Sequence, residues 1–293
     1  MRVQAEFWAD VMARHLQVPK NRPLDEMTTE LIGMIGDTDP RVRDETAYPI
    51  LATWIDSGVY DDLLLGFGDG LSHGLVSGIG EDGTDSVFRR TFTALLLGEC
   101  VSRDNAAHLL PGEVVVRWGD RAAAWFIRER DLRGYVDGKG WAHAGAHGAD
   151  LLGELARSRH FGNLELTVLL DVVGDRLLQP TQHRLVHGED DRLAYAVMAA
   201  FHRNLLGIDV IEPWVARIAN ALIRPRTETG GWPTPTAFNV LSFLRALHVQ
   251  IAVGVKGRNT STDRALFAAT PEVRTDVLLT LLDHLRKGSP WLF

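Results

Sequence analysis

Two histidines and an aspartate at helical spacing are the residues of this chain best suited to chemistry. His143, His147 and Asp150 lie in a glycine- and alanine-rich stretch that is typical of an amphipathic helix. At about 100° per residue, the three side chains fall within roughly 60° of one another. Imidazole exchanges protons near neutral pH, so the pattern predicts an acid–base site with His143, His147 and Asp150 as catalytic residues, Asp150 fixing the tautomer of His147.

The same spacing permits two other interpretations. Histidines at i and i+4 can bind one metal ion, with Asp150 as an oxygen ligand, although no second element offers ligands at a distinctive spacing. Alternatively, the histidines bond to neighbouring helices and the chain is a non-catalytic scaffold for another protein. We assign no metal, and both alternatives stay open at this point.

The segment before the predicted helix supplies residues suited to ligand binding. Arg133 and, further away, Arg89 can pair with an anion, while Tyr135 and Trp141 offer aromatic walls and Asp137 a second carboxylate. Both arginines also have a structural interpretation, as ion pairs or caps that hold turns between helices. We therefore predict a pocket for a small polar or anionic molecule around residues 133–150.

Composition limits the classes of partner and compartment. The net charge of −7 disfavours nucleic acid, and we expect no phosphate-loop or dinucleotide cofactor because neither motif is present. The single cysteine, Cys100, excludes an internal disulfide and favours a reducing compartment. We see no apolar run of about 18 residues that would span a membrane, and we predict a cytoplasmic protein.

The best fold signal begins at Asp39. The run of residues 37–47, Asp-Thr-Asp-Pro-Arg-Val-Arg-Asp-Glu-Thr-Ala, resembles the turn and second helix of a HEAT repeat, with Asp39 as helix cap and Pro40 at the first helical position. Looser versions begin at Asp85, Asp190 and Pro271, and the first interval, 46 positions, matches the period of about 40–47 for such repeats. The sequence predicts one all-α domain over residues 1–293, an irregular α-solenoid of HEAT- or armadillo-like hairpins.

Other elements follow from local patterns. We expect helices over residues 1–16, 27–35 and 236–250, a short strand at Val114–Val116, and a loop over 224–235 that could cover a pocket. Five tryptophans among apolar neighbours are predicted to pack in the core: Trp54, Trp118, Trp125, Trp214 and Trp291.

Three blocks carry a second resemblance. Residues 85–92, 129–135 and 138–152, the last reading Gly-Lys-Gly-Trp-Ala-His-Ala-Gly-Ala-His-Gly-Ala-Asp-Leu-Leu, are similar to the hallmark blocks of a bacterial family known only as a domain of unknown function. The resemblance runs from about Ile35 to the C-terminus. It implies an all-helical fold and a shared site, and it implies no reaction.

Overall fold

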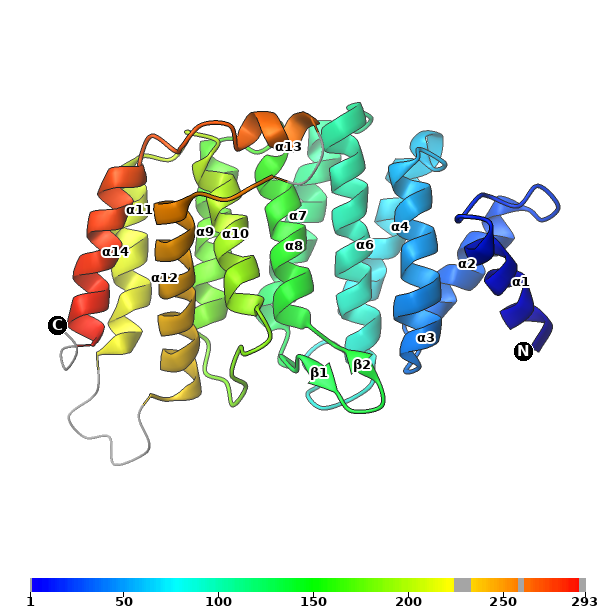
Figure 1. The fold of residues 1–293 in the computed structure, drawn as a ribbon, viewed down its shortest axis with the longest axis horizontal. Coiled ribbons are helices and arrows are strands. Elements are labelled where there is room, and N and C mark those ends of the chain that lie inside the picture. Colours follow the sequence, from blue (N-terminus) through cyan, green and yellow to red (C-terminus); the bar gives the residue numbers. More distant parts are fainter. Residues whose placement is uncertain (1, 224–232, 258–260, 290–293) are drawn as a thin grey trace. The chain divides into compact units, whose positions relative to one another are not determined.

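The computed structural model describes residues 2–223, 233–257 and 261–289, and it is all-α (Figure 1). Helix makes up 69% of the structure and strand 1%, which confirms the predicted class. The chain divides into two compact units, Met1–His147 and Gly148–Phe293. The division falls inside helix α8 (Ala144–Arg157), so no linker segment marks it.

The first unit consists of helices and short helical turns, followed by a small hairpin. In chain order these are α1 (Arg2–Ala13), α2 (Leu24–Met34), α3 (Pro40–Val42), the π-helical turn η1 (Arg43–Ala47), α4 (Tyr48–Asp56), η2 (Asp61–Leu63), α5 (Leu64–Ser72), η3 (His73–Val76), α6 (Ser86–Ala107), α7 (Gly112–Arg128), β1 (Tyr135–Val136) and β2 (Gly140–Trp141). Helix α6 is the centre of this unit, because α4, α5 and η3 all pack against it.

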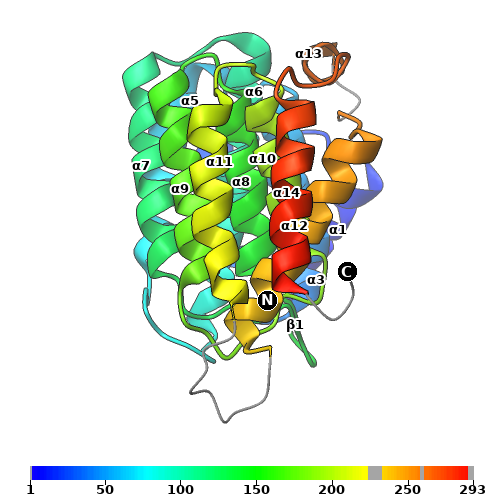
Figure 2. The ribbon, with the colours of Figure 1, turned by 90° about the vertical axis from the view of Figure 1, so that its left-hand side faces the viewer.

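The second unit contains the rest of α8 and a group of packed helices. These are α9 (Asn163–Leu178), α10 (Glu189–Phe201), α11 (Ile208–Ala219), η4 (Asn220–Leu222), α12 (Pro235–Val253), α13 (Ser261–Leu266) and α14 (Arg274–Gly288). Helix α12 packs against α10 and α14, and Figure 2 shows α11 and α14 side by side. Most of the predicted covering loop, residues 224–232, lies outside the described residues.

The predicted helix start at Asp39 is confirmed. The Asp39 carboxylate accepts a hydrogen bond from the backbone N–H of Arg41 at 2.9 Å, and Pro40 occupies the first helical position. Side-chain oxygen at this place satisfies an amide that the helix itself leaves without an acceptor. The helix then widens into η1 at Arg43, a local irregularity that the repeat pattern does not predict.

The predicted strand at Val114–Val116 is wrong, because these residues belong to α7. Val114 and Val115 are buried together with Trp118, Ala122 and Trp125, and this spacing of three and four residues forms the apolar face of a helix. The packing prediction for the tryptophans is confirmed for Trp54, Trp118, Trp125 and Trp214, which are all buried, while Trp291 lies outside the described residues.

Helix α12 is long and apolar enough to cross a membrane, judged by length and composition alone. In the structure, 44% of its most apolar stretch is buried among neighbouring helices. The evidence for a membrane span is weak, because buried core helices of water-soluble proteins satisfy the same criterion.

Two glycines of α5 provide a matched test of packing in the first unit. A Cβ on Gly68 would lie 2.2 Å from the ring of buried Trp118, whereas a Cβ on Gly66 would meet nothing within 4 Å. We expect Gly68→Ala to lower the free energy of unfolding by about 1–3 kcal/mol through overpacking. Gly66→Ala should raise it by about 0.5–1 kcal/mol, because alanine favours a helix. Urea unfolding of both variants measures this, and equal effects would contradict the close α5–α7 contact.

Candidate functional site

The β1–β2 hairpin presents two aromatic rings on its outer face. Tyr135 and Trp141 are cross-strand partners, with ring centroids 5.1 Å apart and planes at 77°. They are 52% and 38% exposed. On the other face, Val136 packs against buried residues of α6 and the β2–α8 junction. The hairpin is thus anchored from inside and carries its aromatic side chains towards solvent.

Two glycines allow the hairpin to turn and to lie close to η1. Gly138 and Gly140 have φ of 71° and 78°, a region that most residues avoid. The Lys139 N–H donates to the Val136 carbonyl at 2.9 Å and closes the turn. At Gly140 a Cβ would lie 2.9 Å from the Pro40 side chain, so only glycine fits there without displacement. The sequence pattern indicates close backbone approach here, but it does not predict the strands.

The two predicted catalytic histidines follow one another behind Trp141. The His143 ring stacks on Trp141 at 4.3 Å and 18°, and its centroid is 5.8 Å from that of His147. The His147 ring in turn makes an edge contact with Phe92 at 5.0 Å. His143 and His147 are 8% and 6% exposed. We call Tyr135, Trp141, His143, His147 and Phe92 the ring series, which runs from solvent into the core.

The backbone at His143 differs from the prediction. Helix α8 begins at Ala144, so His143 precedes it, and its φ is 54°. The His143 carbonyl accepts the N–H of His147 at 2.9 Å, while the His143 N–H donates to the Arg133 carbonyl at 2.9 Å. His143 therefore joins the hairpin to the helix rather than lying within the helix.

Arg43 and Asp44 belong to the site although sequence reasoning missed them there. The buried Arg43 guanidinium donates to the carbonyls of Asp37 and Lys139, each at 2.6 Å, and it lies 4.1 Å above the Phe88 ring. Asp44 pairs with Arg43 and accepts the backbone N–H of Trp141, yet burial raises the pKa of its carboxyl group. Arg43 and Lys139 are 96 residues apart in sequence, so no local pattern could have indicated the contact.

A buried ionic network fixes the segment that leads into the hairpin. Arg90 and Glu129 are both fully buried and form a two-point ion pair, with N–O distances of 2.5 and 2.9 Å. Asp131, also fully buried, accepts the Gly83 N–H at 3.0 Å and pairs with Arg133 at 2.6 Å. These contacts bring together the segments around the first two sequence blocks of the second resemblance.

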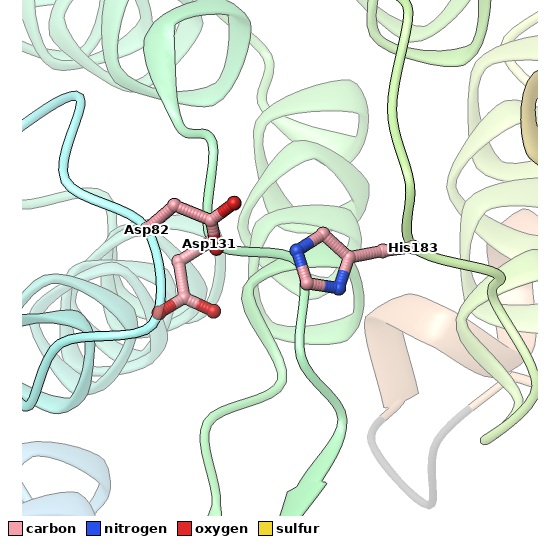
Figure 3. Close-up of side chains that lie close together, drawn as sticks. All are labelled: Asp82, Asp131 and His183. Carbon is pink, nitrogen blue, oxygen red and sulfur yellow. The ribbon is translucent and has the colours of Figure 1, made fainter.

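Figure 3 shows Asp82 and Asp131 with their carboxylates side by side, and oxygen atoms of the two lie within 4.8 Å of each other. Asp82 is exposed and Asp131 is buried, so a solvent-facing acid lies next to an internal one. The third residue in Figure 3, His183, belongs to the second unit, where its carbonyl accepts a hydrogen bond from the Asn239 side chain at 3.0 Å.

The predicted anion-binding arginines both have acceptors within the protein. The Arg133 guanidinium contacts both Asp131 oxygens and the Thr84 carbonyl at 2.7 Å. That of Arg89 donates to the carbonyls of Ile32 and Gly33. Their contacts match the structural interpretation of the two arginines as groups that hold turns.

The two predicted carboxylates lie in different surroundings. Asp137 is exposed in the hairpin turn. Asp150 belongs to the second unit, where its carboxylate pairs with the guanidinium of Arg192, with one N–O distance of 2.9 Å. A proton or metal at Asp150 therefore has to compete with Arg192 for the same oxygen atoms.

Comparison with known proteins identifies a family. The family model described as "Protein of unknown function (DUF2785)" matches residues 75–249, which is more than half of the chain and includes the hairpin and α8. No curated protein and no solved structure matched the sequence.

A buried ion pair, Arg90–Glu129, and a partly exposed one, Lys139–Asp85, should contribute differently to stability. We expect Glu129→Gln to lower the free energy of unfolding by roughly 3 kcal/mol, because it leaves the buried Arg90 charge without its carboxylate. Lys139→Ala removes the partly exposed pair with Asp85 and should cost less than about 1 kcal/mol. Urea unfolding followed by circular dichroism compares them, and a similar loss in both variants would contradict the network's structural role.

Proposed function

The chain belongs to the family described as "Protein of unknown function (DUF2785)", and from that premise we propose that it binds a small polar molecule at the outer face of the β1–β2 hairpin. The site consists of Tyr135 and Trp141, which contact the ligand, and of His143 and His147 behind them. The observation that supports the proposal is the ring series, in which exposed Tyr135 contacts exposed Trp141, Trp141 stacks on buried His143, and His143 contacts buried His147.

The anchoring of the hairpin supports a binding role. The backbone under the two rings is fixed in three ways: the strands β1 and β2 pair with each other, Val136 packs on buried residues, and the Lys139 carbonyl accepts a hydrogen bond from Arg43. Rings held in place lose little conformational freedom when a ligand binds, which improves affinity. Loop residues that are positioned by a rigid scaffold often carry function.

Acid–base catalysis is the activity that the same histidines would supply. Histidine accepts and donates protons near neutral pH. In this proposal His143, which touches Trp141, exchanges a proton with the bound molecule, while His147 holds the His143 ring from behind. The left-handed backbone of His143 is the kind of local strain that is common at functional sites.

We also propose that the helices form a HEAT-like solenoid. Three of the four sequence turns used to predict repeats begin just before a helix, namely before α3 at Pro40, α6 at Ser86 and α14 at Arg274, and the fourth begins at Asp190, the second residue of α10. Helical hairpins of this class offer curved surfaces on which binding sites are built.

Two conservative substitutions test the proposed site. His143→Asn keeps a polar residue that tolerates the left-handed backbone, and His147→Gln keeps a hydrogen-bonding side chain without an imidazole. Saturation-transfer NMR measures binding to a library of small amines, carboxylates and polyols. We expect compounds that bind the wild-type protein to show no binding to either variant, while the circular dichroism spectra stay unchanged.

His73→Gln is the matched control, because His73 is an exposed histidine of the same unit. It should bind every hit with wild-type affinity. Hits that bind all three variants equally would place the binding site elsewhere and refute the proposal.

A second candidate function, a protein-interaction scaffold, is favoured by a groove between α2 and α5. The groove has a volume of about 540 Å³ and is lined by Leu24, Asp25, Thr28, Thr29, Tyr60, Leu63 and Phe67. Leu63 is 59% exposed, and Tyr60 stacks on Phe67 at 4.5 Å. An exposed apolar groove of this kind fits a helix or loop of a partner protein.

Photo-crosslinking in cells tests this candidate. A photoreactive amino acid at position 63 should give one defined protein adduct, and Thr29→Arg should abolish it, because Thr29 is exposed and a bulky cation there fills the groove. The same amino acid at Leu164, which is exposed in the second unit, serves as the control for non-specific adducts. An adduct that persists in Thr29→Arg would argue against the groove.

A further inference from the structure

The surroundings of the hairpin indicate the charge of its ligand. We propose that the site takes a small organic cation with an alkylated ammonium group, held in the corner between the Tyr135 and Trp141 rings. This inference rests on the proposed function and adds the chemical class of the ligand, which the sequence had indicated to be polar or anionic.

The two rings have the geometry of a cation site. Their planes stand at 77° with centroids 5.1 Å apart, so they form two walls of a corner. The stack on His143 at 4.3 Å fixes the orientation of Trp141, and both rings keep a large exposed fraction. The negative face of an aromatic ring attracts a cation within about 6 Å of its centroid.

The cationic side chains around the hairpin are already engaged by protein acceptors. Arg133 pairs with Asp131, Arg43 with Asp44 and two backbone carbonyls, and Lys139 with both oxygens of Asp85 at 2.6 and 2.8 Å. An anionic ligand would have to compete with these partners or displace one of them. Because the partners of Arg133 and Arg43 are buried or half-buried, that exchange would expose an unpaired internal charge.

Negative charge remains available beside the rings. Asp137 lies in the turn that joins the two strands, is exposed, and has no ion-pair partner among the residues that the structure describes. Asp82 is also exposed, and its carboxylate is close enough to influence Arg133, which lies two positions before Tyr135. The local potential and the aromatic faces therefore favour the same sign of ligand charge.

Alkylation of the ammonium group follows from the nature of the walls, because both expose aromatic ring faces to a ligand. A primary ammonium ion is strongly hydrated and loses water reluctantly. Methyl groups spread the charge over an apolar surface, which can contact Tyr135 and Trp141 while Asp137 balances the charge from the rim. The site thus selects a cation that combines weak hydration with methyl contacts.

Three small probes that differ in charge test whether binding depends on the positive charge of the ligand or only on its shape. Saturation-transfer NMR is recorded on the full chain with tetramethylammonium chloride, with the neutral tert-butanol and with sodium acetate. We expect saturation transfer to the methyl protons of tetramethylammonium and none above background for the other two. Equal transfer to tert-butanol would show an uncharged apolar patch and overturn the inference.

Variants locate the bound cation. Tyr135→Leu and Trp141→Leu should each weaken tetramethylammonium binding by roughly fivefold, since each removes one aromatic wall. Asp137→Asn should weaken it by about threefold, whereas Asp62→Asn, the same charge change at an exposed site of the same unit, should leave affinity unchanged. Equal effects of the two Asp→Asn changes would attribute binding to net charge and overturn the inference.

The outcomes also separate this inference from the proposed function. If acetate binds and Trp141→Leu abolishes its binding, the site is real and its ligand is an anion, so only the inference fails. The same conclusion follows if library compounds bind through His143 and His147 while tetramethylammonium does not. If no probe and no library compound depends on the ring series, both proposals fail.

Discussion

The need to satisfy buried charges determines how the hairpin end of the first unit is built. Two guanidinium groups, Arg43 and Arg90, are fully buried, and each binds acceptors from segments far away in sequence. An unpaired buried charge costs several kcal/mol, which is a large share of the stability of a typical domain. These charges therefore hold together the segments that supply the acceptors, which are η1, the loop before α6 and the segment that leads into the hairpin. The position of the hairpin is fixed by its contacts with them.

This constraint also explains how the arginines near the hairpin are used within the protein. Residues that look like anion receptors in the sequence are used to hold turns, as the Arg133–Asp131 pair shows. The aromatic rings of Tyr135 and Trp141 on the same hairpin lie at the surface. The arginines thus hold turns within the protein, while the two rings face solvent.

The fold class and many helix starts could be predicted because their signals are local. The Asp39 cap and the apolar periodicity around Trp118 and Trp125 depend on neighbours within one or two helical turns. The Val114–Val116 run was misassigned because three β-branched residues suggest a strand, whereas their tertiary packing belongs to a longer helical stripe.

The candidate site could be predicted only in part. His143, His147, Tyr135 and Trp141 lie within a short stretch of sequence, and the structure brings their rings into contact. Arg43, Asp44 and Phe92 join them from other segments, and contacts over such separations leave no trace in spacing or composition. Whether an arginine faces a ligand or a buried acid depends on these distant partners.

The backbone of His143 is a second, independent feature of the proposed site at the hairpin. Among the described residues, the other non-glycine residues with positive φ are His15, Leu16, His108 and Asn204, and each follows the end of a helix. A left-handed residue is ordinary there because it terminates the helix.

His143 instead precedes α8, where the backbone usually stays extended. A left-handed conformation costs a non-glycine residue about 1–2 kcal/mol, and glycine at this position would avoid that cost. Glycine would also remove the ring that stacks on Trp141 and touches His147. The conformational cost is therefore coupled to the imidazole that stacks on Trp141 and contacts His147, the two contacts on which the proposed site depends.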